Sequence, residues 1–181
     1  MTRGGATMLS TRENRPQKLA EWQRRMDGVR IDVSRDRGAL WSGIGADTAR
    51  RLAASLQFIT LEMTPIGASL DHGPLKDELI RDFGDQWIAE KRLIFRTLSR
   101  KFVAGLSGHV TVFLPDVLVR PRDGAAGSFA YAVKIIWDEL KDADFGDPRV
   151  AAHRITSMRV CRVRGEQIVS DTIMSSSNRV H

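Results

Sequence analysis

The first apolar positions of the chain recur at helical spacing. Leu19, Trp22 and Met26 fall on one side of a helix, with polar and charged residues between them. Pro16 suits the first turn of such a helix, and Gly28 suits its end. The pattern therefore predicts an amphipathic helix that begins near Pro16 and stops at Gly28.

A second helix is predicted after a short polar gap. Ala49, Leu52, Ala53 and Leu56 repeat at helical spacing and would form its buried side. Asp47 comes just before this repeat, in the first turn, where a carboxylate interacts favourably with the helix dipole.

A longer helical region is predicted over residues 75–103, with an interruption at Gly84. Phe95 and Ser99 lie four positions apart in this region, so they share one face of the helix. The apolar repeat of its second half consists of Trp87, Ile94, Leu98 and Phe102.

Short runs rich in β-branched and aromatic residues predict strands in the rest of the chain. The clearest run is residues 109–114, and Gly165 predicts a hairpin turn between the last two strands. Residues 68–76 show no such pattern and are predicted as a loop. The runs that predict strands are residues 58–63, 109–114, 128–137, 154–164 and 167–169.

The order of these elements predicts a mixed α/β fold class, because helices dominate the first half and strands the second. We expect a helical N-terminal half packed on a short, mostly parallel sheet. Residues 1–15 are polar and predict a flexible leader or linker. Residues 16–175 would then form a single domain, and residues 176–181 a tail.

The composition is ordinary for a globular protein. Of the 181 residues, 42% are hydrophobic and 28% are charged. No apolar run reaches the roughly 18 residues of a membrane span, and residues 1–15 lack the apolar stretch of a secretory signal. We therefore expect no membrane partner, and a protein of the cytoplasm or one delivered into the cytoplasm of a target cell.

Metal and disulfide chemistry are not expected. Cys161 is the only cysteine, which excludes an internal disulfide and a cysteine metal cluster. It lies in an alternating run and is predicted to be an ordinary core residue of a strand. The four histidines, which lack metal-ligand spacing, are His72, His109, His153 and His181.

The net charge of +6 favours an anionic partner. Nucleic-acid binding would need a basic face with aromatic stacking or a recognisable module, and we find no such module. An anionic dinucleotide is favoured by the same positive charge. Nucleic acid is therefore not an expected partner.

The order of several short motifs is more informative than any one of them. Trp41-Ser42 comes first, followed by Thr-Leu-Glu-Met-Thr at residues 60–64. Phe-Arg-Thr-Leu-Ser-Arg-Lys-Phe at residues 95–102 then leads into the predicted strand at residues 109–114. In this order the motifs resemble the ADP-ribosyl cyclase/NAD glycohydrolase family, whose bacterial toxin-like members the chain is most similar to.

The resemblance implies an ADP-ribosyl cyclase-like fold and cleavage of the nicotinamide–ribose bond of NAD. Breaking this N-glycosidic bond builds positive charge on the ribose, which a carboxylate can stabilise. Nicotinamide leaves as an activated group, so NAD is a substrate and no metal or further cofactor is implied. The sequence leaves open the balance of hydrolysis and cyclisation, and the choice between NAD and NADP.

The resemblance also implies a set of substrate-binding residues. Trp41 and Phe95 would offer aromatic faces, although both suit a core position equally well. Glu62 would face the nicotinamide amide, and Asp71 would lie beside the same subsite. Ser99 would touch the ribose near the reacting carbon. The full set is Trp41, Ser42, Glu62, Asp71, Phe95 and Ser99.

The position of the family's catalytic glutamate is the main departure. The turn that precedes it matches Gly127-Ser128, which places Ala130 at the catalytic position. Because alanine cannot stabilise a cation, the chain carries an inactivating replacement, is a pseudoenzyme, or follows another register. In that other register Glu139 takes the role, and it fits the downstream segment better but the upstream turn worse.

These features together predict a NAD glycohydrolase that acts as an NAD-depleting antibacterial toxin domain. Such an effector would need an immunity protein that plugs its pocket. The alternative is a catalytically inactive nucleotide- or protein-binding module of the same fold. NAD binding without turnover, not restored by Ala130→Glu, would favour that module.

Overall fold

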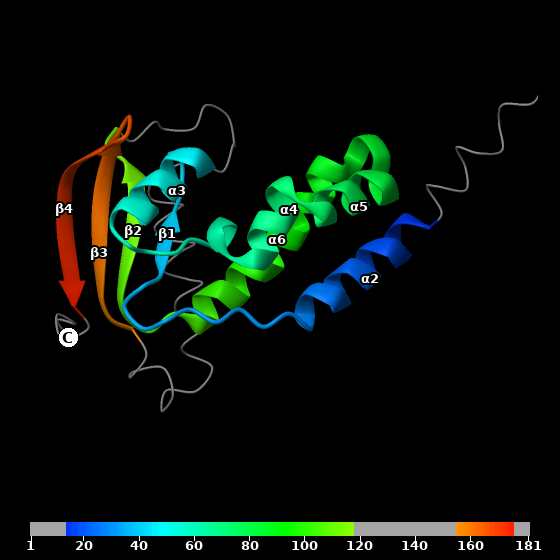
Figure 1. Ribbon diagram of the computed structural model, residues 1–181, viewed down its shortest axis with the longest axis horizontal. Helices are drawn as coiled ribbons and strands as arrows, with labels where there is room; N and C mark the ends of the chain where they lie inside the picture. The colour runs from blue at the N-terminus through cyan, green and yellow to red at the C-terminus, as the bar shows by residue number, and fades with distance from the viewer. Residues whose placement is uncertain (1–13, 118–154, 176–181) are drawn as a thin grey trace, which may run out of the picture. The chain divides into compact units, whose positions relative to one another are not determined.

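The computed structural model describes residues 14–117 and 155–175 (Figure 1). Most of the predicted leader, the predicted strand at residues 128–137 and the C-terminal tail lie outside the described residues. The same holds for Ala130 and Glu139, so both registers of the catalytic position stay predictions.

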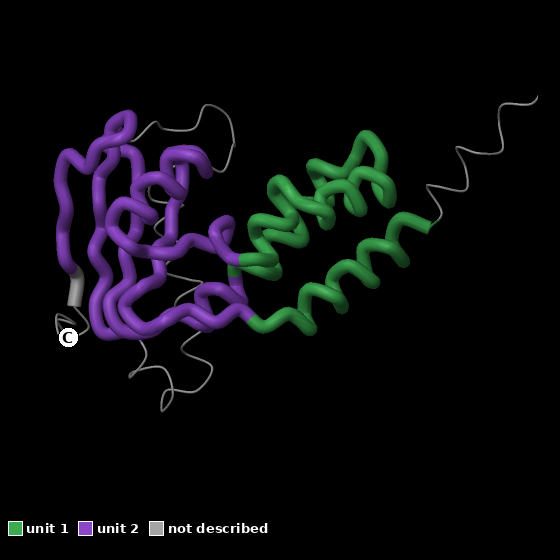
Figure 2. The backbone as a smooth tube through the Cα atoms, viewed as in Figure 1, with its two compact units in different colours: residues 1–30, 65–99 green, residues 31–64, 100–181 purple. Residues whose placement is uncertain are grey.

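The chain groups into two compact units (Figure 2). Unit 1 contains Met1–Arg30 and Pro65–Ser99, and unit 2 contains Ile31–Thr64 and Arg100–His181. The single domain over residues 16–175 stays a prediction.

Helices make up the part of unit 1 that the structure describes. They are α2 (Arg15–Asp27), α4 (Pro65–His72), α5 (Pro74–Phe83) and the part of α6 (Trp87–Gly105) up to Ser99.

Helix α2 confirms the first predicted helix. Pro16 lies in its first turn, and the backbone N–H of Gly28 closes the last turn on Arg24 O at 3.2 Å. Trp22 and Met26 are buried, as the apolar spacing predicts. Polar contacts also connect α2 to α5 and α6. They join Trp22 Nε1 to Asp82 Oδ2 at 2.9 Å, Arg25 to Glu78 at 2.6 Å, and Arg15 to Glu90.

The loop predicted for residues 68–76 is wrong. Helix α4 runs through its first half and α5 begins at Pro74, so Gly73 alone separates the two helices. Proline and glycine here do not mark a loop, since proline fits the first helical turn, where no N–H partner is needed. The Ser69 hydroxyl accepts the backbone N–H of Leu75 at 3.4 Å and so helps to join the two helices.

The interruption predicted at Gly84 is confirmed. Gly84 ends α5 with a φ of +52°, a conformation that favours glycine, and a short 3₁₀ turn, η2 (Gly84–Gln86), leads into α6. The apolar repeat of α6 is also confirmed, since Ile94 and Leu98 are fully buried.

The sheet lies in unit 2 and has four strands in the order β1-β2-β3-β4. Strands β1 and β2 run parallel, β2 and β3 run parallel, and β4 is antiparallel to β3 across the predicted hairpin at Gly165. The mixed α/β class and the mostly parallel sheet are therefore confirmed. The strands are β1 (Ala39–Trp41), β2 (Gly108–Pro115), β3 (Ile155–Arg164) and β4 (Gln167–Ser175).

Apolar clusters cover both faces of this sheet. One face packs Phe113 and Cys161 against α3 (Ala46–Ser55), the second predicted helix, which Figure 1 shows beside the sheet. The other face packs Val112 and Leu114 with Val103. Cys161 is thus a buried core residue, as predicted, and burial raises the pKa of its thiol.

The strand predicted for residues 58–63 is wrong. Only Ile59 makes a bridge, with Gly38, and the chain then turns into a 3₁₀ helix, η1 (Leu61–Met63). Threonines on both sides favour the turn over a strand. Met63 N–H donates to Thr60 O at 3.1 Å, and the Thr64 hydroxyl donates to Leu61 O at 2.6 Å.

No helix among the described residues is both long and apolar enough to cross a membrane.

Candidate functional site

Two of the predicted site residues are in direct contact within unit 2. The indole Nε1 of Trp41 donates a hydrogen bond to Glu62 Oε2 at 3.0 Å. Both side chains are half-buried, and Trp41 also packs against the apolar cluster around Phe113. Trp41 thus contacts the core and also donates to a carboxylate, while its role as an aromatic face for a substrate stays a prediction.

The backbone brings these two residues together although 21 positions separate them. The segment before Glu62 is hydrogen-bonded alongside β1, since Ile59 N–H donates to Arg37 O at 2.7 Å and Ala39 N–H donates to Ile59 O at 2.9 Å. The turn η1 then carries Glu62 back towards the end of β1. Sequence reasoning placed Glu62 in a strand, but the 3₁₀ turn is what directs it to Trp41.

This pair offers a held carboxylate at a partly exposed position. The indole N–H occupies Oε2, and Oε1 has no hydrogen-bond partner among the residues that the structure describes. A carboxylate in this state can accept amide or hydroxyl hydrogens, or lie against a positive charge. Accepting an amide hydrogen is the task that the resemblance implies for Glu62.

Two further predicted residues meet at a single lysine within unit 1. Lys91 Nζ lies 2.7 Å from Asp71 Oδ1 and 5.3 Å from the centre of the Phe95 ring. The ammonium group also lies 5.8 Å from the centre of the Trp87 ring, and Lys76 lies 5.7 Å from that ring. Asp71 is therefore not an isolated acid, because the half-buried ammonium group of Lys91 lies beside it.

Sequence reasoning missed Lys91 and the role of Trp87, although the spacing contains a signal for both. Trp87, Lys91, Phe95 and Ser99 are each four positions apart, so α6 presents them on one face. The motif that singled out Phe95 and Ser99 begins after Lys91, which is why the first half of this face was overlooked.

The two serines of the predicted set have fewer polar contacts than its acidic and aromatic residues. Ser99 is half-buried one turn beyond Phe95, and Ser42 donates its backbone N–H to Phe113 O at 3.1 Å. Neither hydroxyl has a hydrogen bond among the residues described. The predicted set thus falls into two groups, Trp41, Ser42 and Glu62 in unit 2, and Asp71, Phe95 and Ser99 in unit 1.

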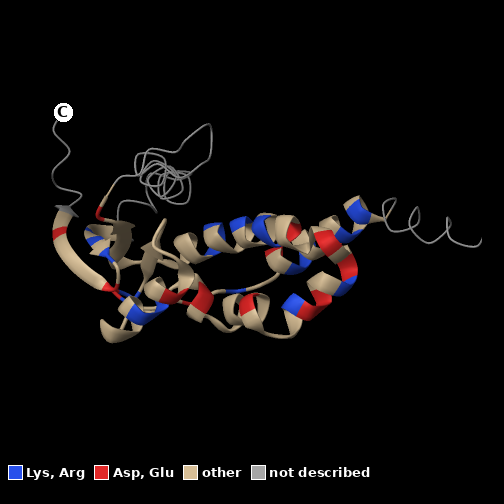
Figure 3. Cartoon of the chain, turned by 90° about the horizontal axis from the view of Figure 1, so that it is seen from above, with Lys and Arg blue, Asp and Glu red and all other residues tan. Residues whose placement is uncertain are grey.

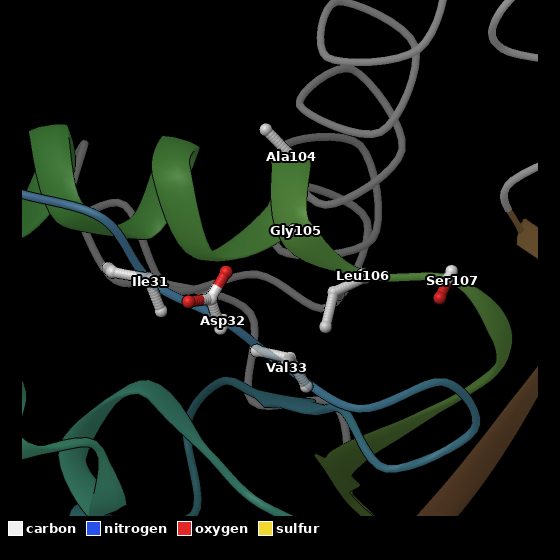
Figure 4. Close-up of a pocket in the computed structure, with 7 residues that line it drawn as sticks. All are labelled: Ile31, Asp32, Val33, Ala104, Gly105, Leu106 and Ser107. Atoms are coloured by element: carbon white, nitrogen blue, oxygen red, sulfur yellow. The ribbon is translucent and has the colours of Figure 1, made fainter.

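A shallow pocket of about 310 Å³ also lies in unit 2 (Figure 4). It is formed where the loop after α2 passes the end of α6, and the two backbones approach closely there, since a Cβ on Gly105 would lie 3.0 Å from Ile31 O. No predicted site residue lines it. The residues that do are Ile31, Asp32, Val33, Ala104, Gly105, Leu106 and Ser107.

No group of three or more His, Cys, Asp or Glu side chains that could hold a metal ion occurs in the described ranges. Comparison with protein-family models, with curated proteins and with solved structures finds no match to this chain. The functional interpretation therefore depends on the residues themselves and on the contacts they make.

Proposed function

We propose that this chain is a NAD glycohydrolase of the ADP-ribosyl cyclase type, which converts NAD to nicotinamide and ADP-ribose. The observation that carries the proposal is the hydrogen bond from Trp41 to Glu62. The family resemblance implies that these two residues belong to one subsite. They are remote in sequence, and they are in contact in the structure. A mostly parallel sheet with helices in a mixed α/β protein supports the same proposal at the level of fold.

The chemistry requires a carboxylate that is fixed before the substrate arrives. In the proposed reaction the ribose–nicotinamide C–N bond breaks, and its electron pair neutralises the pyridinium nitrogen. Water then adds to the ribosyl cation and releases a proton. Glu62, held by the indole N–H, would accept the carboxamide N–H of nicotinamide and so orient the leaving group.

The group around Lys91 changes the expected role of Asp71. Because Asp71 is paired with Lys91, it would not offer a free negative charge to nicotinamide. We assign this pair to holding the Phe95 ring, through the ammonium that lies 5.3 Å from its centre. Phe95 would then be the stacking surface, and Asp71 a positioning residue.

The biological part of the proposal is a toxin domain that depletes NAD in a target cell and is neutralised by an immunity protein. Production of an active form without such a partner should lower cellular NAD. Unchanged NAD levels in cells that contain active enzyme would argue against the toxin role without affecting the enzymatic one.

The decisive experiment is nicotinamide release from NAD by the full chain, beside its Ala130→Glu variant. Activity only in the variant would support the register that places the catalytic glutamate at residue 130. Activity in the original chain that is lost in Glu139→Gln would support the other register. NAD binding without turnover in both the original chain and the Ala130→Glu variant would favour the binding module, and absence of both binding and turnover would overturn the proposal.

The role of the Trp41–Glu62 pair has its own test in the active form. Trp41→Phe keeps an aromatic ring but removes the N–H, so kcat/KM should fall by about tenfold or more, the equivalent of one charged hydrogen bond. The matched control is Trp22→Phe, which removes an indole–carboxylate hydrogen bond in unit 1. We expect it to leave kcat/KM unchanged.

A further inference from the structure

The exposed side of α6 differs from the other charged helix surfaces of unit 1. Arg92 and Arg96 lie one turn apart on it and are both exposed. Ile88 and Leu93 lie beside them, with exposed fractions of 52% and 41%. No acidic residue occurs on this side of the helix between residues 88 and 96, since Glu90 is fully buried. Figure 3 shows basic positions recurring along α6.

Arg92 and Arg96 differ from several other cations of the unit, although Arg24 and Arg81 likewise have no ion pair among the described residues. Arg15, Lys18, Arg25 and Lys91 each lie within ion-pair distance of a carboxylate. Arg92 and Arg96 have no ion pair among the described residues. Their charges are thus not used within the part of the fold that the structure describes.

We propose that this surface of α6, defined by Ile88, Arg92, Leu93 and Arg96, binds an acidic protein segment, of which an amphipathic helix with carboxylates one turn apart is the simplest form. Guanidinium groups pair with carboxylates through two parallel hydrogen bonds, and one turn of helix separates the two arginines just as it would separate their partners. Ile88 and Leu93 supply the apolar contacts that protein interfaces bury beside arginine.

The same observations favour a protein over nucleic acid. Helix α5, in contrast, carries charges of both signs, since three acidic residues lie beside Lys76 and Arg81. A polyanion is usually bound by a broad basic surface. Large exposed aliphatic side chains, such as those between these arginines, add nothing to contacts with phosphates. This inference does not depend on the proposed enzymatic activity.

The test uses the purified full chain and a synthetic acidic helix of about 20 residues, with glutamates at i, i+4 and leucines beside them. Binding is measured by fluorescence anisotropy at about 0.1 M salt. The double variant Arg92→Glu/Arg96→Glu should bind about tenfold more weakly or worse. Leu93→Ser should also weaken binding, by about threefold or more.

The matched control is Arg24→Glu/Arg81→Glu, which makes the same change of net charge at exposed arginines of α2 and α5. It should change the Kd by less than about threefold. Equal loss in both double variants would overturn the proposal, because it would show a general charge effect. If either variant is unfolded by circular dichroism, Arg92→Gln/Arg96→Gln and its control counterpart replace the pair.

Two further probes separate the other classes of partner. A DNA duplex of about 20 base pairs and vesicles of mixed anionic and zwitterionic phospholipid are titrated under the same conditions. Either probe binding through Arg92 and Arg96, with no binding of the acidic helix, would overturn the proposal. Preference for the acidic helix, lost in the α6 variant and kept in the control, would support it.

Discussion

Unit 2 and unit 1 bury their side chains in different surroundings. In unit 2, apolar clusters cover both faces of the sheet, and Phe113 is wholly buried in one of them. In unit 1, polar contacts such as that of Trp22 with Asp82 connect the helices, and Glu90 is fully buried with an Oε2 that has no partner among the described residues. Apolar packing depends on volume, whereas a buried polar contact depends on both of its partners. The two units should therefore respond to different substitutions.

The largest effect is expected from Phe113→Ala in unit 2. It removes a large side chain from the cluster between the sheet and α3, which should lower the free energy of unfolding by about 3–5 kcal/mol. Urea unfolding followed by circular dichroism measures this loss. Val169→Ala, at a side chain that is 43% exposed on β4, is the control and should have an effect within about 0.5 kcal/mol. Similar losses for both variants would show that apolar packing does not dominate in unit 2.

The next largest effect is expected at the Arg15–Glu90 pair in unit 1, where removing the cation should cost more stability than removing the carboxylate. Arg15→Ala leaves a buried carboxylate without its cation, and the side chain of Arg15 is 44% exposed, so water can replace part of the contact. We expect a loss of about 2 kcal/mol, below the usual range for a fully buried pair. Glu90→Met removes the carboxylate and its unpaired oxygen together and should be nearly neutral. A larger loss from Glu90→Met than from Arg15→Ala would reverse this interpretation.

A smaller effect is expected where α2 meets α5. Trp22→Phe keeps most of the buried ring but removes the donor to Asp82 Oδ2, which stands 2.9 Å from Nε1. The loss of one hydrogen bond should lower the free energy of unfolding by about 1 kcal/mol. The double variant Trp22→Phe/Asp82→Asn should lose little more than Trp22→Phe alone. Fully additive losses in urea unfolding would mean that the two side chains do not act through this bond.

The smallest effect concerns pH and the thiol in unit 2. Burial raises the pKa of Cys161, an effect that the nearby charge of Arg159 opposes. Below the ordinary thiol pKa, the Cys161 thiol is protonated in both the folded and the unfolded protein. The contribution of its raised pKa to stability is then fully present. As the pH rises above that value, the unfolded chain ionises first, so stability should fall with rising pH. Cys161→Ala should remove this part of the pH dependence of the urea midpoint.

Periodicity predicted the elements that bury one continuous side. Helices α2, α3 and α6 and strands β2 and β3 were predictable because packing in each repeats at a fixed interval along the chain. The errors lie in residues 58–76, where a short apolar run was interpreted as a strand and residues 68–76 as a loop. A six-residue run does not show which strand it would pair with. Here the hydroxyl of Thr64 donates to Leu61 O, which favours a turn over a strand. Strand β1 is three residues long and has no period to detect.

The sequence motifs proposed candidate site residues but could not predict the contacts that these residues make. The motifs selected Trp41 and Glu62, and the structure places them in contact. They could not reveal Lys91, because an ion pair between Asp71 and a residue 20 positions away depends on how α4 and α6 pack. Charge alone could not show which arginines are left unpaired, since that depends on which carboxylates the fold brings near.

The alignment of Trp87, Lys91, Phe95 and Ser99 on one face of α6 depends on the number of residues between them as much as on the side chains themselves. Each residue of an α-helix adds about 100° of rotation, so deleting one position after Lys91 would swing Phe95 and Ser99 a quarter-turn or more away from the two residues before them. Exchanges of one side chain for another leave this alignment intact. Insertions and deletions within these thirteen positions should therefore be far more damaging than substitutions at any one of them.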